Sequence, residues 1–163
     1  MTAPLIRTGL YRTTLALPSH PEVVPAGRLV MMYMTDQHPN PIVAMPTGVK
    51  DNRWEFPLRG IPVTDETWLG ALVALPNQGF YTVSSPLVLG SGTELPVNLL
   101  VQLAFTQDGR AMLFPAQLMP GNRIQMTERG VLLSDLQLDS LAPTSFRLMA
   151  PVETAAAPAE PSK

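Results

Sequence analysis

Short apolar segments, separated by prolines and turn residues, alternate along the chain with polar stretches. The clearest is Leu29–Thr35, whose valine, tyrosine and methionine residues favour a strand. Side chains of a strand point alternately to its two faces. We therefore expect Val30, Met32 and Met34 to face the core. Eighteen prolines in 163 residues argue against a helical bundle, because proline disrupts a helix interior.

The pattern of residues 9–75 recurs about 70 residues later, in residues 79–141. Each half reads as a strand, a hairpin, another strand and a short helical turn. We therefore predict a mainly β fold of two tandem repeats of about 67 residues, packed as a pseudo-symmetric sandwich or a partly open barrel. The matching pairs include Gly9 and Gly79, Tyr11 and Tyr81, Pro25 and Pro96, Asn52 and Asn122, Gly60 and Gly130, and Asp65 and Asp135.

These repeats set the expected domain boundaries. We predict an N-terminal arm at residues 1–8, the first repeat at 9–75 and the second at 76–149. Residues 150–163 are rich in proline and alanine and are expected to form a disordered tail.

Several further elements follow from the same patterns. Residues 53–63 and 123–133 are each expected to form one strand, with prolines in the first marking an edge or a bulge. Pro115 is expected to end the strand that begins near Met112, and residues 145–148 to close the second repeat.

Helix starts are also predicted. Asp65 and Asp135 are expected to cap short helices, since a carboxylate accepts hydrogen bonds from free backbone N–H groups. Ser134 and Gln137 have the spacing of a capping box. Residues 136–141 fit a short helix or a strand equally well.

The two halves differ on the reverse face of the clearest strand. In the second half this face is polar at its centre, at Gln102, and we expect truncation of that side chain to change stability little. In the first half the same face carries Met31 and Tyr33. These two side chains either pack inside the chain or form a patch that binds a partner, where methionine and aromatic residues are enriched.

Composition favours an assembling subunit over an isolated neutral domain. Charged residues make up 15% of the chain, against about 25% in typical domains, and Lys50 and Lys163 are the only lysines. Interfaces are depleted in lysine and glutamate. We therefore expect protein partners or self-association.

Charge and hydropathy also limit the function classes. The net charge is −2 with no basic stripe, so nucleic-acid binding is not expected. No apolar run approaches the roughly 18 residues of a membrane span, and the N-terminus lacks a signal-peptide pattern. We expect a cytoplasmic protein, or one incorporated into a particle that assembles inside the cell.

Candidate chemistry is sparse. The chain has no cysteine, and its two histidines, His20 and His38, each lie beside proline in expected loops without further ligands at metal-binding spacing. Neither a nucleophile elbow nor a phosphate loop is present. We predict no catalytic residue, no metal and no cofactor, and hence a protein that is not an enzyme.

Four arginines recur at equivalent positions: Arg53 and Arg59 in the first half, Arg123 and Arg129 in the second. A spacing of six puts each pair on one face of a regular strand. They either form structural salt bridges, for example to Asp65 and Asp135, or bind anions through the guanidinium fork.

Two functions remain in view. The first is a structural or adaptor subunit of a virion or another multi-subunit particle. The second is a small-ligand or anion-binding module with a site between the repeats. The residues expected to line such a site are Trp54, Trp68, Phe56 and Tyr33.

Overall fold

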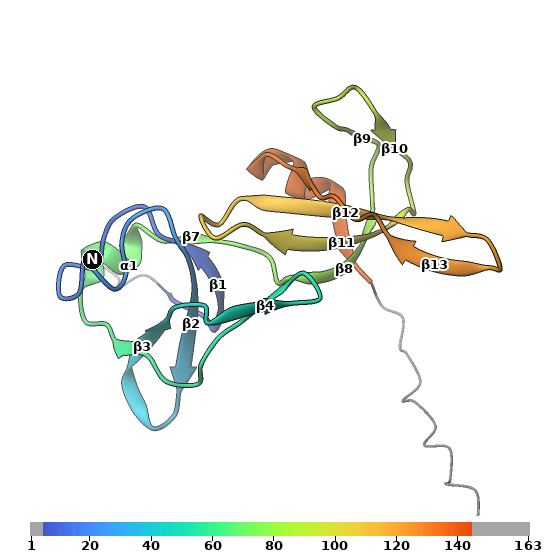
Figure 1. The fold of residues 1–163 in the computed structure, drawn as a ribbon. Helices are drawn as coiled ribbons and strands as arrows, with labels where there is room; N and C mark the ends of the chain where they lie inside the picture. The colour runs from blue at the N-terminus through green and yellow to red at the C-terminus, as the bar shows by residue number, and fades with distance from the viewer. Residues whose placement is uncertain (1–4, 145–163) are drawn as a thin grey trace, which may run out of the picture.

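The computed structural model describes residues 5–144. The fold is mainly β and contains several sheets, which do not close into a barrel. Figure 1 shows one sheet in blue and cyan at the left and another in green to orange at the right. The expected closing strand at residues 145–148 and the expected tail at 150–163 lie outside the described residues.

The first sheet has the strand order β6-β3-β2-β1-β7 and is antiparallel throughout. A short helix, α1 (Glu66–Gly70), precedes its last strand. The strands are β1 (Gly9–Arg12), β2 (Leu29–Thr35), β3 (His38–Ala44), β6 (Ile61–Pro62) and β7 (Val73–Ala74).

The second sheet has the order β13-β12-β11-β8-β15, and β14 also pairs with β12. A 3₁₀ helix, η1 (Asp135–Ser140), precedes its last strand, so residues 136–140 of the ambiguous segment are helical and Leu141 begins a strand. The strands are β8 (Gly79–Val83), β11 (Leu100–Phe105), β12 (Ala111–Met119), β13 (Arg123–Met126), β14 (Val131–Leu132) and β15 (Leu141–Pro143).

Two small hairpins lie outside these sheets. The strands β4 (Gly48–Lys50) and β5 (Arg53–Glu55) form one of them. The other consists of β9 (Leu87–Val88) and β10 (Glu94–Leu95), which extends away from the second sheet in Figure 1.

The cap expected at Asp65 and the capping box of Ser134 and Gln137 are present, but the cap expected at Asp135 was wrong, because Ser134 is the N-cap of that helix. The Asp65 carboxylate accepts a hydrogen bond from the Trp68 backbone N–H at 2.8 Å and caps α1. The Gln137 side-chain oxygen accepts from the Ser134 backbone N–H at 2.9 Å, as a capping box requires. Asp135 lies in the first turn of η1, and its carboxylate pairs with Arg12.

Three strand predictions were wrong in detail. Residues 53–63 are divided between β5 and β6, because residues 56–60 leave the ladder, and residues 123–133 are likewise divided between β13 and β14. Proline does confine β6 to the edge of its sheet, as expected. Pro115 does not end β12, since it lies where the outer neighbour of that strand changes from β14 to β13.

The predicted core face holds with one exception. Val30 and Met32 are fully buried, with Trp68 and Val43 in the same cluster. Met34 is 43% exposed, because it lies near the end of β2 beyond that cluster. The expectation that Met34 faces the core was therefore wrong.

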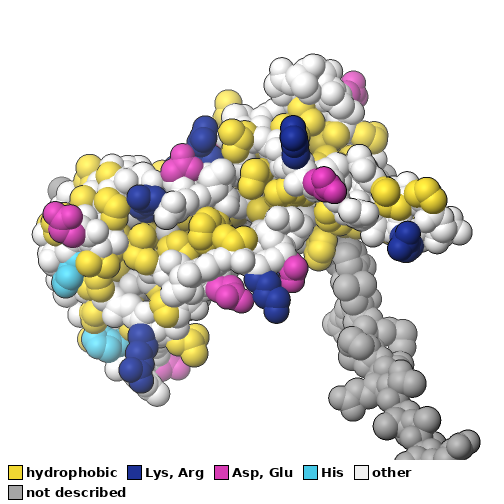
Figure 2. Space-filling view, in the orientation of Figure 1, with side chains coloured by type: hydrophobic (Ala, Val, Ile, Leu, Met, Phe, Trp, Pro, Cys, Tyr) yellow, Lys and Arg dark blue, Asp and Glu magenta, His cyan; other side chains and the backbone are white. Residues whose placement is uncertain are grey.

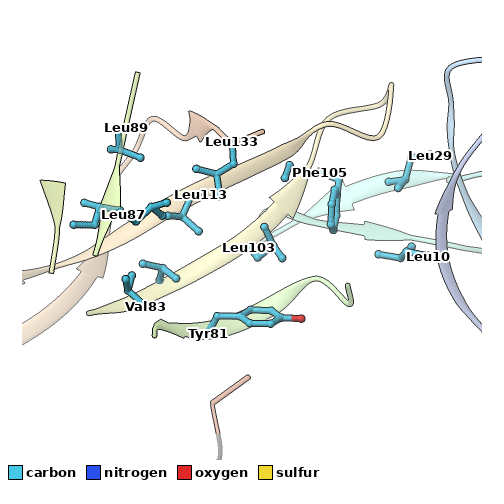
Figure 3. Packing of buried hydrophobic residues seen from close by; sticks show 13 residues of the cluster. Leu10, Leu29, Tyr81, Val83, Leu87, Leu89, Leu103, Phe105, Leu113 and Leu133 are labelled. Carbon is cyan, nitrogen blue, oxygen red and sulfur yellow. The ribbon is translucent and has the colours of Figure 1, made fainter. Parts of the chain in front are cut away.

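A second core cluster joins the two sheets. It contains the inward-facing residues of the second sheet together with Leu10 and Leu29 from the first. Figure 3 shows Phe105, at the end of β11, between these two leucines and the remaining leucines of the second sheet. The end of the second sheet thus packs against one face of the first.

Gly60 and Gly130 recur because of close packing. A Cβ atom at Gly60 would lie 2.1 Å from the Val43 backbone oxygen, and one at Gly130 would lie 2.3 Å from the Met112 side chain. Neither glycine has a positive φ angle. Close packing therefore explains why both positions hold glycine.

Among the described residues, no helix has the length and apolar character needed to cross a membrane.

Candidate functional site

The β4–β5 hairpin leaves the first sheet and lies on β11 of the second (Figure 1). Trp54 makes the closest contact: its indole N–H donates to the Phe105 backbone oxygen at 2.6 Å. Its ring also packs against the core cluster that joins the sheets. One aromatic side chain thus supplies both apolar contact and a hydrogen bond.

The turn of this hairpin contacts Gln102, whose side-chain N–H donates to the Asp51 backbone oxygen at 2.8 Å. The Asn52 side chain donates to the Gln102 side-chain oxygen at 3.3 Å. Gln102 is consequently only 6% exposed. The expectation that truncating Gln102 changes stability little took no account of this hairpin of the other half, which covers the side chain.

Gln78 fixes the outer edge of β5. Its side-chain oxygen accepts from the Trp54 backbone N–H at 2.9 Å, and its side-chain N–H donates to the Trp54 oxygen at 2.7 Å. A side-chain amide thus occupies the place of a neighbouring strand. The hairpin is held on three sides: by Trp54, by Gln102 and by Gln78.

The corresponding hairpin of the second half is the outer part of β12 with β13, residues 116–126, called the arm below. Figure 1 shows it extending beyond the rest of the second sheet. Leu118 and Ile124 are cross-strand partners in the arm and are 74% and 66% exposed. Figure 2 shows hydrophobic side chains gathered at its far end. In the described part of the chain, β13 pairs with β12 alone.

The two hairpins have similar turns but different surfaces. Asp51 and Asn52 adopt positive φ angles in one turn, and Gly121 and Asn122 adopt them in the other. The docked hairpin carries four charged residues over residues 48–55, whereas Arg123 is the only charged residue of the arm. The exposed hairpin is therefore the less charged of the two.

Met31 and Tyr33, the candidate contact residues, are both half-buried on β2. Met31 packs against the core cluster that joins the sheets. Tyr33 pairs with Ile42, and Ile42 with Pro62, so three apolar side chains form a row across the first sheet. Partial burial raises the pKa of the Tyr33 hydroxyl. We call Met31 and this row the β2 face.

The four recurrent arginines are all exposed and belong to separate loops and hairpins. Arg53 and Arg59 do not share a strand face, because the strand is interrupted between them. The suggested salt bridges to Asp65 and Asp135 are absent from residues 5–144. Arg12 pairs with Asp135 instead, at 2.6 Å.

The Arg12–Asp135 ion pair joins the first sheet to η1 of the second half. Arg12 also donates to the Gly109 backbone oxygen at 3.3 Å. The hydrogen bond from Arg12 lowers the pKa of the Asp135 carboxyl and raises that of the guanidinium. Sequence reasoning missed this pair, because Arg12 has no charged counterpart in the second half and Asp135 was interpreted as a helix cap.

The expected aromatic pocket between the halves is not formed by one group of side chains. Trp54 and Phe56 pack in the cluster that joins the sheets, while Trp68 is buried in the other cluster and donates its indole N–H to the Leu15 oxygen at 2.9 Å. A pocket of about 330 Å³ lies beside α1. Its lining residues are Leu5, Ile6, Met34, Asn40, Pro41, Val63, Thr64, Glu66 and Leu69.

Both histidines lie on the surface. The His20 ring contacts the Ser19 hydroxyl at 3.0 Å, and His38 begins β3. Over residues 5–144, no group of three or more His, Cys, Asp and Glu side chains is placed to hold a metal ion.

Comparison with protein-family models, curated proteins and solved structures found no match to this chain.

Proposed function

We propose that the protein is a non-enzymatic structural or adaptor subunit that acts through protein–protein contacts in a larger assembly, such as a virion or another multi-subunit particle. The observation that carries this proposal is the arm: among residues 5–144 its outer strand β13 pairs with β12 alone, and its Leu118–Ile124 pair is largely exposed. Edge strands with apolar side chains tend to associate unless they are covered.

We also propose that the chain consists of two tandem copies of one unit. The strand orders of the two sheets support this, because equivalent strands occupy equivalent places. A recurrent contact supports it further: the Tyr11 hydroxyl donates to the Arg7 oxygen, and the Tyr81 hydroxyl donates to the Asn77 oxygen. Sandwich packing of these units stays a prediction.

The ligand-binding alternative has one observation in its favour. The pocket beside α1 falls in the size range of small-molecule sites. Its lining is mainly apolar, with Glu66 as its only charged residue, so a small apolar or cationic molecule would suit it better than an anion. It holds none of the recurrent arginines.

The proposed location is the cytoplasm or a particle assembled there, which suggests a direct test in the native host. The full chain should sediment with material far larger than 17.7 kDa in native extracts. Replacing Leu118 and Ile124 by Asp should release it, because a buried carboxylate without a partner is strongly unfavourable.

Leu136→Asp is the matched control, since Leu136 is 85% exposed but belongs to η1 and not to the arm. It should sediment as the wild type does. A wild-type chain that sediments as a free monomer in the host would contradict the proposed function.

A further inference from the structure

The chain itself shows what covers a hairpin of this kind. The β4–β5 hairpin leaves one sheet and lies on the next, with Trp54 reaching Phe105 and the turn reaching Gln102. Ala104, between these two contact points on β11, is only 2% exposed. A hairpin from one unit therefore docks on the sheet of the following unit.

The arm is the equivalent hairpin of the second unit, but no third unit follows it among the described residues. Trp54 pairs with Val49 next to one turn, and Ile124 pairs with Leu118 next to the other. The arm also lies at the end of its sheet that is farthest from the first sheet (Figure 1). It does not reach the first sheet of its own chain.

The first sheet presents the corresponding acceptor surface. Met31 occupies the place of Gln102, because each lies on the third strand of its sheet. Met31 pairs with residues of β1 and β3, and Gln102 pairs with residues of β8 and β12. Tyr33 occupies the place of Ala104. Tyr33 is half-exposed, whereas Ala104 is buried under the hairpin.

The hairpin and the sheet surface that it contacts differ in chemistry in a matched way between the two halves. Inside the chain, polar groups meet: the Trp54 indole N–H and the Asp51 carbonyl on the hairpin, the Phe105 carbonyl and the Gln102 amide on the sheet. On the arm and the β2 face, apolar side chains stand in place of the Trp54 indole and the Gln102 amide. Ile124 stands for Trp54 on the arm, and Met31 stands for Gln102 on the sheet. Met31 already packs against the cluster that joins the sheets, so the row of Tyr33, Ile42 and Pro62 is the partly exposed portion of the β2 face.

We propose that the arm of one copy docks on the β2 face of a second copy, so that the protein self-associates head to tail. The contact repeats the one between the two halves of a single chain. Because the arm and the β2 face are different surfaces, the contact is heterologous and generates a ring or an open filament. This inference rests on the proposed function and names the partner as the chain itself.

The absence of cysteine permits a direct test on the full chain. Purified Ile124→Cys protein is mixed with purified Tyr33→Cys protein under mild oxidation. The expected product is a disulfide-linked heterodimer, because side chains in the docked contact come within the few ångströms that a disulfide requires.

Leu136→Cys mixed with Tyr33→Cys is the matched control, since Leu136 is more exposed than Ile124. The control mixture should give at least about tenfold less heterodimer, which is the ratio expected if the docked contact lowers Kd about tenfold. Equal yields from the two mixtures would overturn the inference. All three changes are at exposed or half-exposed positions, and a thermal melt of each variant checks that the fold is intact.

Sedimentation velocity of the wild-type chain gives a second measurement that needs no substitution. Its mean sedimentation coefficient should rise between about 1 and 100 µM, a range in which a contact of micromolar Kd becomes populated. A monomer throughout that range overturns the inference. If such a monomer still enters large particles in its host through the arm, the proposed function stands and the arm binds a different protein.

Discussion

The β4–β5 hairpin and the arm have similar turns, yet within residues 5–144 only the β4–β5 hairpin lies on another sheet. The β4–β5 hairpin is charged, carries Trp54 and is anchored by Gln78 and Gln102. The arm has one charge, carries Ile124 and extends from the sheet with its apolar pair exposed. The way in which the β4–β5 hairpin docks therefore suggests how the exposed arm would dock on a partner.

The largest expected contrast is between equivalent positions at the ends of β2 and β11. Phe105→Ala should lower the free energy of unfolding by about 3–5 kcal/mol, because the ring fills the junction of the two sheets. Met34→Ala should change it by less than about 0.5 kcal/mol, since Met34 is 43% exposed. Urea titrations measure both. Similar losses would show that the two sheet ends are buried alike.

The hairpins themselves give the next contrast. Trp54→Ala should destabilise the fold by about 3 kcal/mol, because it removes a packed ring and leaves the Phe105 oxygen without its donor. Ile124→Ala should leave the stability of the monomer within about 0.5 kcal/mol of the wild type. Thermal denaturation at low protein concentration checks this. A destabilised Ile124→Ala monomer would mean that the arm packs on its own chain.

The recurrent glycines should separate the two units more finely. Gly60→Ala should cost about 1–3 kcal/mol, because the new methyl group meets the rigid Val43 backbone oxygen. Gly130→Ala should cost less, since its nearest neighbour is the flexible Met112 side chain. Chemical denaturation of both variants measures the order. The reverse order would contradict the packing described for the first sheet.

The smallest expected effect concerns the ion pair between the halves. The folded-state pKa of Asp135 is below its ordinary value of 3.8, so the pair contributes stability above that pH and loses it as the pH falls through the folded-state pKa. The Asp135 side chain is 56% exposed, which limits the contribution to less than about 1 kcal/mol. Comparing wild type with Arg12→Ala between pH 7 and pH 2 tests this. A difference that grows toward low pH would contradict the assignment.

Much of the fold was predictable because it depends on local patterns. Alternation located β2 and β11, and the capping residues located the starts of α1 and η1. Met34 and Pro115 were misjudged, because the end of a strand depends on which neighbour covers it and not on its own sequence.

The candidate site was less predictable. Sequence placed Met31 and Tyr33 on the face that distinguishes the halves. It did not predict that Gln102 is covered, because nothing local reveals a hairpin that arrives from 50 residues away. The arm was missed altogether. Its signal was present as a loss of charge, since the four charged residues of one hairpin are reduced to Arg123 in the other.

Amide hydrogen exchange tests the central claim most directly, because it reports on both hairpins in one experiment. Amides of β5 should be protected at every protein concentration, since this hairpin docks within the chain. Amides of β13 should exchange rapidly in dilute solution and become protected as the concentration rises toward about 100 µM, where copies associate. Protection of β13 that does not change with concentration would contradict the account.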